Sequence, residues 1–207
     1  MYLAIAGNIG VGKSRLTELV ARRYGLEPVY EAVDDNPYLA DFYQDMSRYA
    51  FHSQMFFLAK RLEQHVGSVN GVRNVVQDRT LYEDAAIFAR HLFESGMMSR
   101  RDFDSYQLMV RAASQALRPP DLLVYLRASV PTLKSRIALR GRDYEADIAP
   151  EYLQSLNDLY ERWLSGYRLS ETLIVEADGL DFVNRSHDRS WLLGWLEQHG
   201  LGAQAVS

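Results

Sequence analysis

The sequence predicts an α/β fold in which a parallel five-stranded sheet is covered by helices on both faces. Short apolar runs alternate with longer segments of helical spacing along most of the 207 residues. This alternation is typical of parallel strands joined by helical crossovers. Hydrophobic residues make up 47% of the chain, which is enough for a sizeable core, and we expect a single domain over residues 1–207.

Each strand is predicted from a short apolar run that ends at a turn-forming or acidic residue. The first run ends at Gly7, the second at Glu31 and the third at Asp78. Such runs, bounded by turn signals, indicate buried strands. The predicted strands are 2–6, 28–30, 72–77, 121–126 and 172–175.

The helices are predicted from apolar residues spaced three and four apart and from the residues that bound them. Gly25 and Gly96 are stop signals, and Ser99 is a good N-cap. Pro119-Pro120 breaks the helix that Ser99 begins. The predicted helices are 14–24, 37–44, 48–66, 81–94, 99–117, 131–139, 150–167 and 191–199.

The composition and charge exclude several classes of protein. A net charge of −4 gives no general attraction to nucleic acid, and the absence of cysteine excludes disulfides and thiolate zinc sites. The first apolar run is too short for a signal peptide, and no stretch approaches the ~20 apolar residues that span a bilayer. We therefore expect a cytoplasmic protein without a nucleic-acid or membrane partner.

A phosphate-binding motif follows the first predicted strand. The pattern G-x-x-x-x-G-K-[ST] is matched by Gly7, Asn8, Ile9, Gly10, Val11, Gly12, Lys13 and Ser14. The glycines let the backbone wrap around phosphate oxygens, and the following helix N-terminus attracts anions. Lys13 is expected to reach the β- and γ-phosphates of ATP, and Ser14 to bind Mg²⁺. The Asn-Lys-x-Asp and Asp-x-x-Gly motifs of GTPases do not occur, which favours a kinase.

Three arginines, Arg136, Arg140 and Arg142, follow the fourth predicted strand. Crowded guanidinium groups repel one another until an anion arrives, and phosphoryl transfer requires stabilisation of charge on the transferring group. Gly141 allows a hinge, so residues 140–148 are predicted to form a short arginine-rich lid over ATP. A lid beside the phosphate-binding loop predicts a three-layer P-loop kinase fold.

In their order along the chain, these motifs resemble the deoxyribonucleoside kinase family. The resemblance runs from about residue 2 to about residue 183 and is strongest, through Gln77–Asp84, to bacterial deoxyadenosine/deoxycytidine kinases. It implies transfer of a phosphoryl group from ATP to the 5′-hydroxyl of a deoxyribonucleoside, with Mg²⁺, and a homodimer. Apolar residues on the predicted helices 48–66 and 81–94 offer a helix-to-helix contact for such a dimer. Besides the P-loop, the resemblance rests on Glu31, Asp35–Leu39, Gln54, Lys60-Arg61, Gln77–Thr80, Arg140–Arg142, Tyr152 and Asn157–Tyr160.

The resemblance assigns the reaction to groups that follow the strands. Glu31 would accept the proton of the 5′-hydroxyl, because a hydroxyl is a poor nucleophile until its proton is taken. Asp78 would hold Mg²⁺ through water, together with Ser14. Arg79 would bridge Glu31 and the reacting phosphate, while Lys13 and the lid arginines stabilise its charge.

The resemblance also places the base of the nucleoside between two helices. Gln54 and Arg61 are seven residues apart and share a helix face, with Gln54 at the base edge and Arg61 deeper beside Asp84. Asp84 can accept a hydrogen bond from an exocyclic amine, which thymine lacks. Phe88, four residues after Asp84, would stack on the base. Deoxyadenosine or deoxycytidine is the expected substrate, with deoxyguanosine as the alternative.

The sugar and the adenine of ATP have expected contacts of their own. Tyr43 and Glu145 match positions at the sugar 3′-hydroxyl, and Asp181-Phe182 matches the loop beside the adenine. Two other functions stay open on the same core: a thymidylate-type monophosphate kinase and a nucleotide-binding subunit without transfer activity. Phosphorylation of monophosphates would favour the first, and no ATP consumption would favour the second.

Overall fold

The computed structural model describes residues 1–31, 35–71, 74–145 and 147–201. All neighbouring strands of its sheet pair in parallel, in the order β2-β3-β1-β4-β5, which confirms the predicted fold class. The strands are β1 (Tyr2–Gly7), β2 (Glu27–Val29), β3 (Val75–Asp78), β4 (Leu122–Arg127) and β5 (Glu171–Glu176).

The middle strand, β1, is buried along its whole length between β3 and β4. Leu3 lies opposite Val76 on one side and Leu122 on the other. A strand covered on both faces reads as a continuous apolar run, which is why 2–6 shows no alternation of polar and apolar residues.

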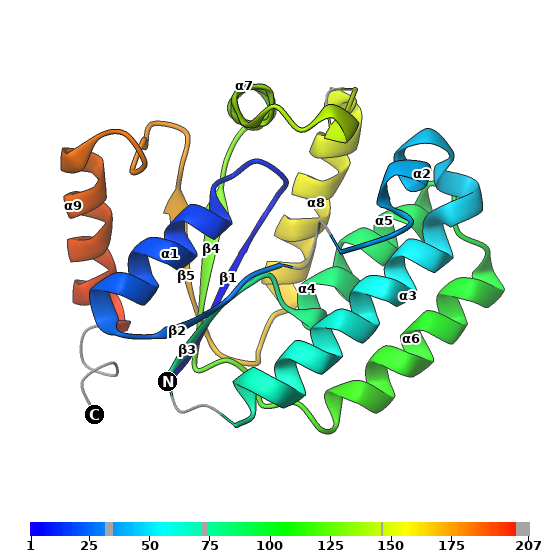
Figure 1. Cartoon of the computed structure of the whole chain (residues 1–207), viewed down its shortest axis with the longest axis horizontal. Helices are drawn as coiled ribbons and strands as arrows, with labels where there is room; N and C mark the ends of the chain where they lie inside the picture. The colour runs from blue at the N-terminus through cyan, green and yellow to red at the C-terminus, as the bar shows by residue number, and fades with distance from the viewer. Residues whose placement is uncertain (32–34, 72–73, 146, 202–207) are drawn as a thin grey trace.

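Helices cover the sheet on both sides, as Figure 1 shows. Helices α1 and α9 lie on one side, while α8 and the group α3 to α6 lie on the other. The helices are α1 (Lys13–Tyr24), α2 (Leu39–Gln44), α3 (Met46–Gln64), α4 (Leu81–Ala86), α5 (Phe88–Glu94), α6 (Arg100–Ser114), α7 (Val130–Arg140), α8 (Pro150–Gly166) and α9 (Ser186–Leu196). Short turns of other helix types are His65–Val69, Asp143–Glu145 and Glu197–Leu201.

Two predicted helices were wrong in extent. The predicted helix 81–94 is two helices, separated at Ile87 (φ −109°, ψ −69°), which caps the end of α4 and the start of α5. Apolar spacing does not record a break of one residue. The last helix begins at Ser186 instead of 191, in a polar stretch without an apolar signal. The third strand is observed at 75–78, and residues 72 and 73 of its predicted range lie outside the described residues.

The apolar core has two parts. One surrounds the sheet and includes Leu3, Val124 and Leu156, and the other lies among α2 to α6 around Leu58 and Phe103. The P-loop follows β1, Asp78 ends β3, and α7 begins three residues after β4. These parts therefore meet at the carboxyl end of the sheet, where parallel α/β proteins bind ligands.

Candidate active site

The P-loop between β1 and α1 depends on glycines at positions where a side chain does not fit. Gly10 has φ +81°, and a Cβ there would lie 2.7 Å from Ile137 Cγ1 of α7. Gly12 has φ +108°, and a Cβ there would lie 3.0 Å from the Phe182 ring. Positive φ and close approach both favour glycine. The predicted loop is thus packed between α7 and the predicted adenine loop.

Lys13 begins α1 and its side chain is buried in the loop. Its Nζ donates to the Asn8 carbonyl oxygen at 3.2 Å. Burial, together with the positive charge of Arg79, lowers the pKa of Lys13 to about 8. A phosphate group would add negative charge beside this ammonium and stabilise its protonated form further.

Asp78 and Ser14 lie together at the start of the same helix. Ser14 Oγ donates to Asp78 Oδ2 at 2.5 Å. Asp78 Oδ1 is buried and has no hydrogen-bond partner among the described residues. A hydroxyl and a carboxylate are oxygen donors of the kind that Mg²⁺ prefers, so this pair fits the predicted metal role.

A buried network of charges joins Glu31, the predicted general base, to the residues predicted to select the nucleobase. Arg61 on α3 donates through Nη2 to Glu31 Oε1 at 2.8 Å and through Nε to the Asp84 carboxylate on α4. Arg79 Nη1 lies 3.4 Å from the same Glu31 oxygen. Glu31 is therefore held between two guanidinium groups, and four residues from separate parts of the chain form one site.

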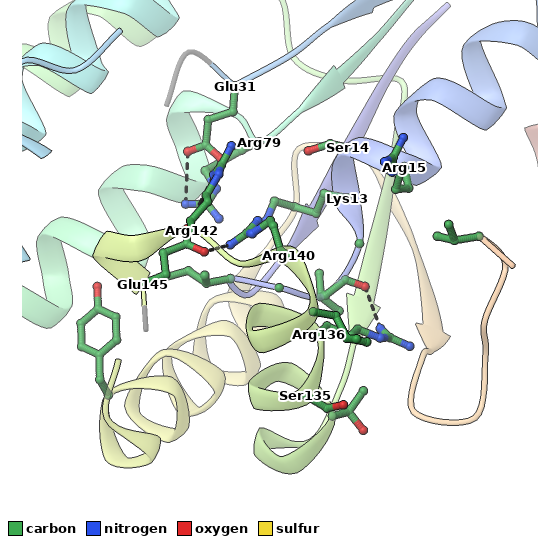
Figure 2. A pocket seen from close by; sticks show the side chains of 18 of the residues that line it. Lys13, Ser14, Arg15, Glu31, Arg79, Ser135, Arg136, Arg140, Arg142 and Glu145 are labelled. Carbon is green, nitrogen blue, oxygen red and sulfur yellow. Dashed lines mark hydrogen bonds and ion pairs between the residues drawn. The ribbon is translucent and has the colours of Figure 1, made fainter. Parts of the chain in front are cut away.

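The charge of Glu31 is strongly stabilised. Burial raises the pKa of the carboxyl, but the nearby Arg79, Arg61 and Lys13 outweigh it and lower the pKa to about 2. Glu31 is thus a carboxylate at neutral pH. Figure 2 shows Glu31 and Arg79 together at one end of the pocket, with Lys13 and Ser14 near them.

A single cleft of about 1110 Å³ contains most of the predicted site. This volume exceeds the roughly 300–1,000 Å³ of a typical one-ligand site, which suits two substrates. The predicted residues that line it are Ile9, Gly10, Val11, Gly12, Lys13, Ser14, Glu31, Tyr43, Gln54, Arg79, Asp84, Phe88, Arg136, Arg140, Arg142, Glu145, Asp181 and Phe182. Arg61 lies behind it and reaches it through Glu31 and Asp84.

The base end of the cleft presents polar and aromatic groups. Gln54 is buried, and its Oε1 has no hydrogen-bond partner among the described residues. The Phe88 ring lies 4.1 Å from the guanidinium carbon of Arg79. Ser53 Oγ accepts from Asn36 Nδ2 at 3.0 Å. A small, hydrogen-bonded side chain therefore stands beside Gln54.

The lid segment is tied to a predicted sugar-binding residue. Arg140 donates to the Glu145 carboxylate, and Arg142 Nη1 lies 3.6 Å from Glu145 Oε1. Tyr144 stacks on Tyr43 of α2, with ring centroids 5.8 Å apart. Residue 146 of the predicted lid lies outside the described residues. Glu145 thus joins the lid arginines to the region of Tyr43.

Arg136 takes a different direction from Arg140. Its Nη1 donates to the Val11 carbonyl oxygen at 2.8 Å, and its Nη2 donates to those of Ala177 and Leu180 at 2.7 and 2.8 Å. Figure 2 places it at the other end of the pocket from Glu31. In this conformation Arg136 fastens the P-loop to the loop that carries Asp181.

Two buried features of the site were not predicted from the sequence, the Glu83 carboxylate and the hydrogen bond between Asn36 and Ser53. Glu83, one residue before Asp84, is fully buried under the P-loop, where its carboxylate accepts from the Tyr160 hydroxyl. Its spacing of four from Arg79 was the available signal. The hydrogen bond between Asn36 and Ser53 had no signal, because the residues lie on different elements.

The sequence matches one known protein family over most of its length. The model of the deoxynucleoside kinase family matches residues 3–198. This chain belongs to the deoxynucleoside kinase family. The kinase is therefore an ATP-dependent phosphotransferase that acts on deoxynucleosides, as the motifs predicted.

Relatives that are named for different deoxynucleosides resemble the kinase over most of its length. It is 36% identical over 186 residues to the deoxyadenosine/deoxycytidine kinase of Bacillus subtilis (strain 168), which covers 88% of this chain and 85% of that protein. It is 34% identical over 200 residues to a deoxyguanosine kinase of Lactobacillus acidophilus, which covers 92% and 87%.

Solved structures of a deoxyadenosine kinase from M. mycoides share the fold. The form with bound dATP matches with a TM-score of 0.83 and 29% identity, over 95% of this chain and all of that one. The form with the products dCMP and dCDP matches with a TM-score of 0.84 over 96% of this chain. Within the described residues, no helix combines the length and apolar character needed to cross a membrane.

Proposed function

We propose that the kinase transfers the γ-phosphoryl group of ATP to the 5′-hydroxyl of a deoxynucleoside, with Glu31 as the general base. The observation that carries this proposal is the position of Glu31. Its carboxylate is held by Arg61 and Arg79 in the cleft that Lys13 also lines. An alcohol between this carboxylate and a phosphate on the P-loop would have the in-line arrangement that phosphoryl transfer requires.

The electrostatics of the site link proton transfer to nucleotide binding. A carboxylate whose pKa is about 2 is a weak base. Phosphate charge near Lys13 and Arg79 would offset the two cations that stabilise the Glu31 anion, and so would raise the pKa of Glu31. Glu31 would therefore gain basicity when the phosphoryl donor is in place.

The other cations would have separate roles. Lys13 would hold the β- and γ-phosphates, while Arg140 and Arg142 would leave Glu145 in part to stabilise charge on the transferring group. Ser14 and Asp78 would hold Mg²⁺, which when bound neutralises phosphate charge. Arg136 would act at the nucleotide by fixing the P-loop against the adenine loop at Asp181.

We propose an amino-bearing base, with deoxyadenosine and deoxycytidine preferred and deoxyguanosine as the alternative. The Gln54 oxygen, which has no hydrogen-bond partner among the described residues, can accept from an amine, and so can the Asp84 carboxylate, which lines the same cleft. Thymine offers no amine to these acceptors. The names of the Bacillus subtilis and M. mycoides relatives support deoxyadenosine and deoxycytidine, and that of the Lactobacillus acidophilus relative supports deoxyguanosine.

The deciding experiment is a substrate panel with ATP and Mg²⁺. The panel contains deoxyadenosine, deoxycytidine, deoxyguanosine and thymidine, each beside its 5′-monophosphate. We expect monophosphate products from the first three and little from thymidine. A preference for thymidine would refute the proposed base selection. Turnover of the monophosphates alone would instead favour the thymidylate-type reaction.

A homodimer through helix packing is proposed as the assembly. Helices α4 and α5, predicted at the interface, are largely buried within the chain, whereas α6 exposes Leu108 and Met109 with exposed fractions of 59% and 50%. We therefore place α6, beside α3, at the contact. Leu108→Glu should shift the mass from light scattering toward the monomer, while Leu169→Glu on another surface should not. An unchanged mass for Leu108→Glu would exclude α6.

Two further expectations stay predictions. Limited proteolysis that yields one resistant core would support a single domain over 1–207, and two separable fragments would refute it. Fractionation of the source cells would test the cytoplasmic location.

A further inference from the structure

Glu83 on α4 is a buried carboxyl group that joins three parts of the site. It is 0% exposed. Its Oε1 accepts from the Tyr160 hydroxyl of α8 and from the Gly7 backbone N–H at 3.3 Å. Its Oε2 has no hydrogen-bond partner among the described residues. Placing an acidic group here is costly, which calls for a reason beyond packing.

The neighbouring Arg79 supplies that reason. Arg79 Nε lies 3.6 Å from Glu83 Oε1, while Arg79 Nη1 lies 3.4 Å from Glu31 Oε1. The guanidinium group is therefore placed between two carboxylates. The backbone of Arg79 also has φ +66°, a left-handed conformation that residues other than glycine rarely adopt. Arg79 needs support from its surroundings to keep this position.

We propose that Glu83 is a positioning residue for phosphoryl transfer, acting through Arg79. Its carboxylate holds the inner edge of the guanidinium group, so that the outer edge faces Glu31 and the phosphate region. Through Gly7 and Tyr160 it also fixes the start of the P-loop against α8. The proposal rests on the proposed role of Glu31.

The effect depends on the charge of Glu83, and its surroundings make that charge sensitive to pH. Burial raises the pKa of Glu83 to about 7, against the lowering effects of Arg79, Lys13 and the Tyr160 hydrogen bond. The ionised form is the one that attracts Arg79. We therefore expect kcat/KM to rise with pH through about 7 as Glu83 loses its proton. Among the described residues, the titratable groups that affect the pKa of Glu83, or whose own pKa the charge of Glu83 affects, include Lys13, Arg79, Asp84, Tyr125, Tyr160 and Tyr167.

The charge of Glu83 also affects Glu31, the proposed general base. In the wild type, Arg79 divides its attraction between Glu83 and Glu31. Without the Glu83 charge, Arg79 would interact more strongly with Glu31 and stabilise its anion further. Glu31 would then be a weaker base, and kcat would fall even if Arg79 stayed in place.

The test compares Glu83→Gln with Glu63→Gln, a change at an exposed glutamate on α3 that pairs with Lys60. Glutamine keeps the size and an acceptor oxygen but removes the charge. We expect Glu83→Gln to lower kcat at least about tenfold, with KM for the deoxynucleoside within about threefold of wild type. We also expect the rise of kcat/KM through about pH 7 to disappear. Glu63→Gln should match the wild type in all three quantities.

Two results would overturn the proposal. One is a Glu83→Gln enzyme with wild-type kcat and pH profile. The other is a loss of kcat that only follows the folded fraction, measured by circular dichroism, with the rise through about pH 7 intact. The wild type and Glu31→Gln are assayed in parallel. If the wild type turns over and Glu31→Gln does not, the proposed function stands whatever Glu83→Gln does.

Discussion

Replacing Glu31 by glutamine tests the centre of the proposed mechanism. Glutamine is nearly the same size and keeps an oxygen that can accept from Arg61 Nη2, now at 2.8 Å. It cannot accept a proton from the 5′-hydroxyl at neutral pH. The loss of a general base predicts a fall in kcat of about 10²–10⁴-fold. ATP binding should persist, because the P-loop is unchanged.

The same substitution has a cost in stability that follows from the pKa of Glu31. The difference between the ordinary value of 4.5 and about 2 corresponds to roughly 3 kcal/mol of favourable interaction of the ionised carboxylate. Because the folded-state pKa is the lower one, this stabilisation is complete above pH 4.5 and is lost as the pH falls through about 2. Glu31→Gln should therefore lower the free energy of unfolding by about 3 kcal/mol at pH 7, and by less in acid.

Urea unfolding at pH 7 and at pH 4 would measure the stability change, and initial rates with deoxyadenosine would measure kcat. Glu27→Gln is the matched control, since Glu27 is an exposed residue of β2 whose removal should change neither quantity. Undiminished turnover of Glu31→Gln would remove Glu31 from the role of base. An unfolding free energy equal to that of the wild type would refute the electrostatic account of the site.

Three other predictions concern nucleotide binding, the loop and the base. Because the pKa of Lys13 is about 8, the dissociation constant of ATP should be constant below that pH and rise about tenfold per pH unit above it. Lys13→Arg should give a flat profile, and equal profiles for the two proteins would refute the role of Lys13. Gly10→Ala should lower the free energy of unfolding in urea by about 1–3 kcal/mol, because φ at this position is +81°. Gly67→Ala, where a Cβ would meet open space, should lower it by less than about 1 kcal/mol, and equal losses would contradict the packing argument. Asp84→Asn should lower kcat/KM for deoxycytidine relative to thymidine by roughly tenfold or more, and an unchanged ratio would show that Asp84 does not select the base.

The local structure that was predicted correctly has local causes. The P-loop is continuous in sequence, so its glycines and the start of α1 already define its shape, and Ser99 was confirmed as an N-cap that accepts from the Asp102 N–H at 3.1 Å. The parallel sheet and its layers followed from the alternation of apolar runs with helical segments, whereas the strand order was not predicted. The residue sets at the cleft came from the family resemblance.

The pairing of charges has no local cause. Arg61 and Asp84 are 23 residues apart, and Gly7 and Glu83 are 76 apart, so each contact depends on how separate elements pack. Arg136 and Arg140 share a helix face by spacing, yet one donates to backbone carbonyls and the other to Glu145. Periodicity specifies which side of a helix a residue occupies, because it follows from backbone geometry. It does not specify which partner waits there, because that partner is brought by the folding of the rest of the chain.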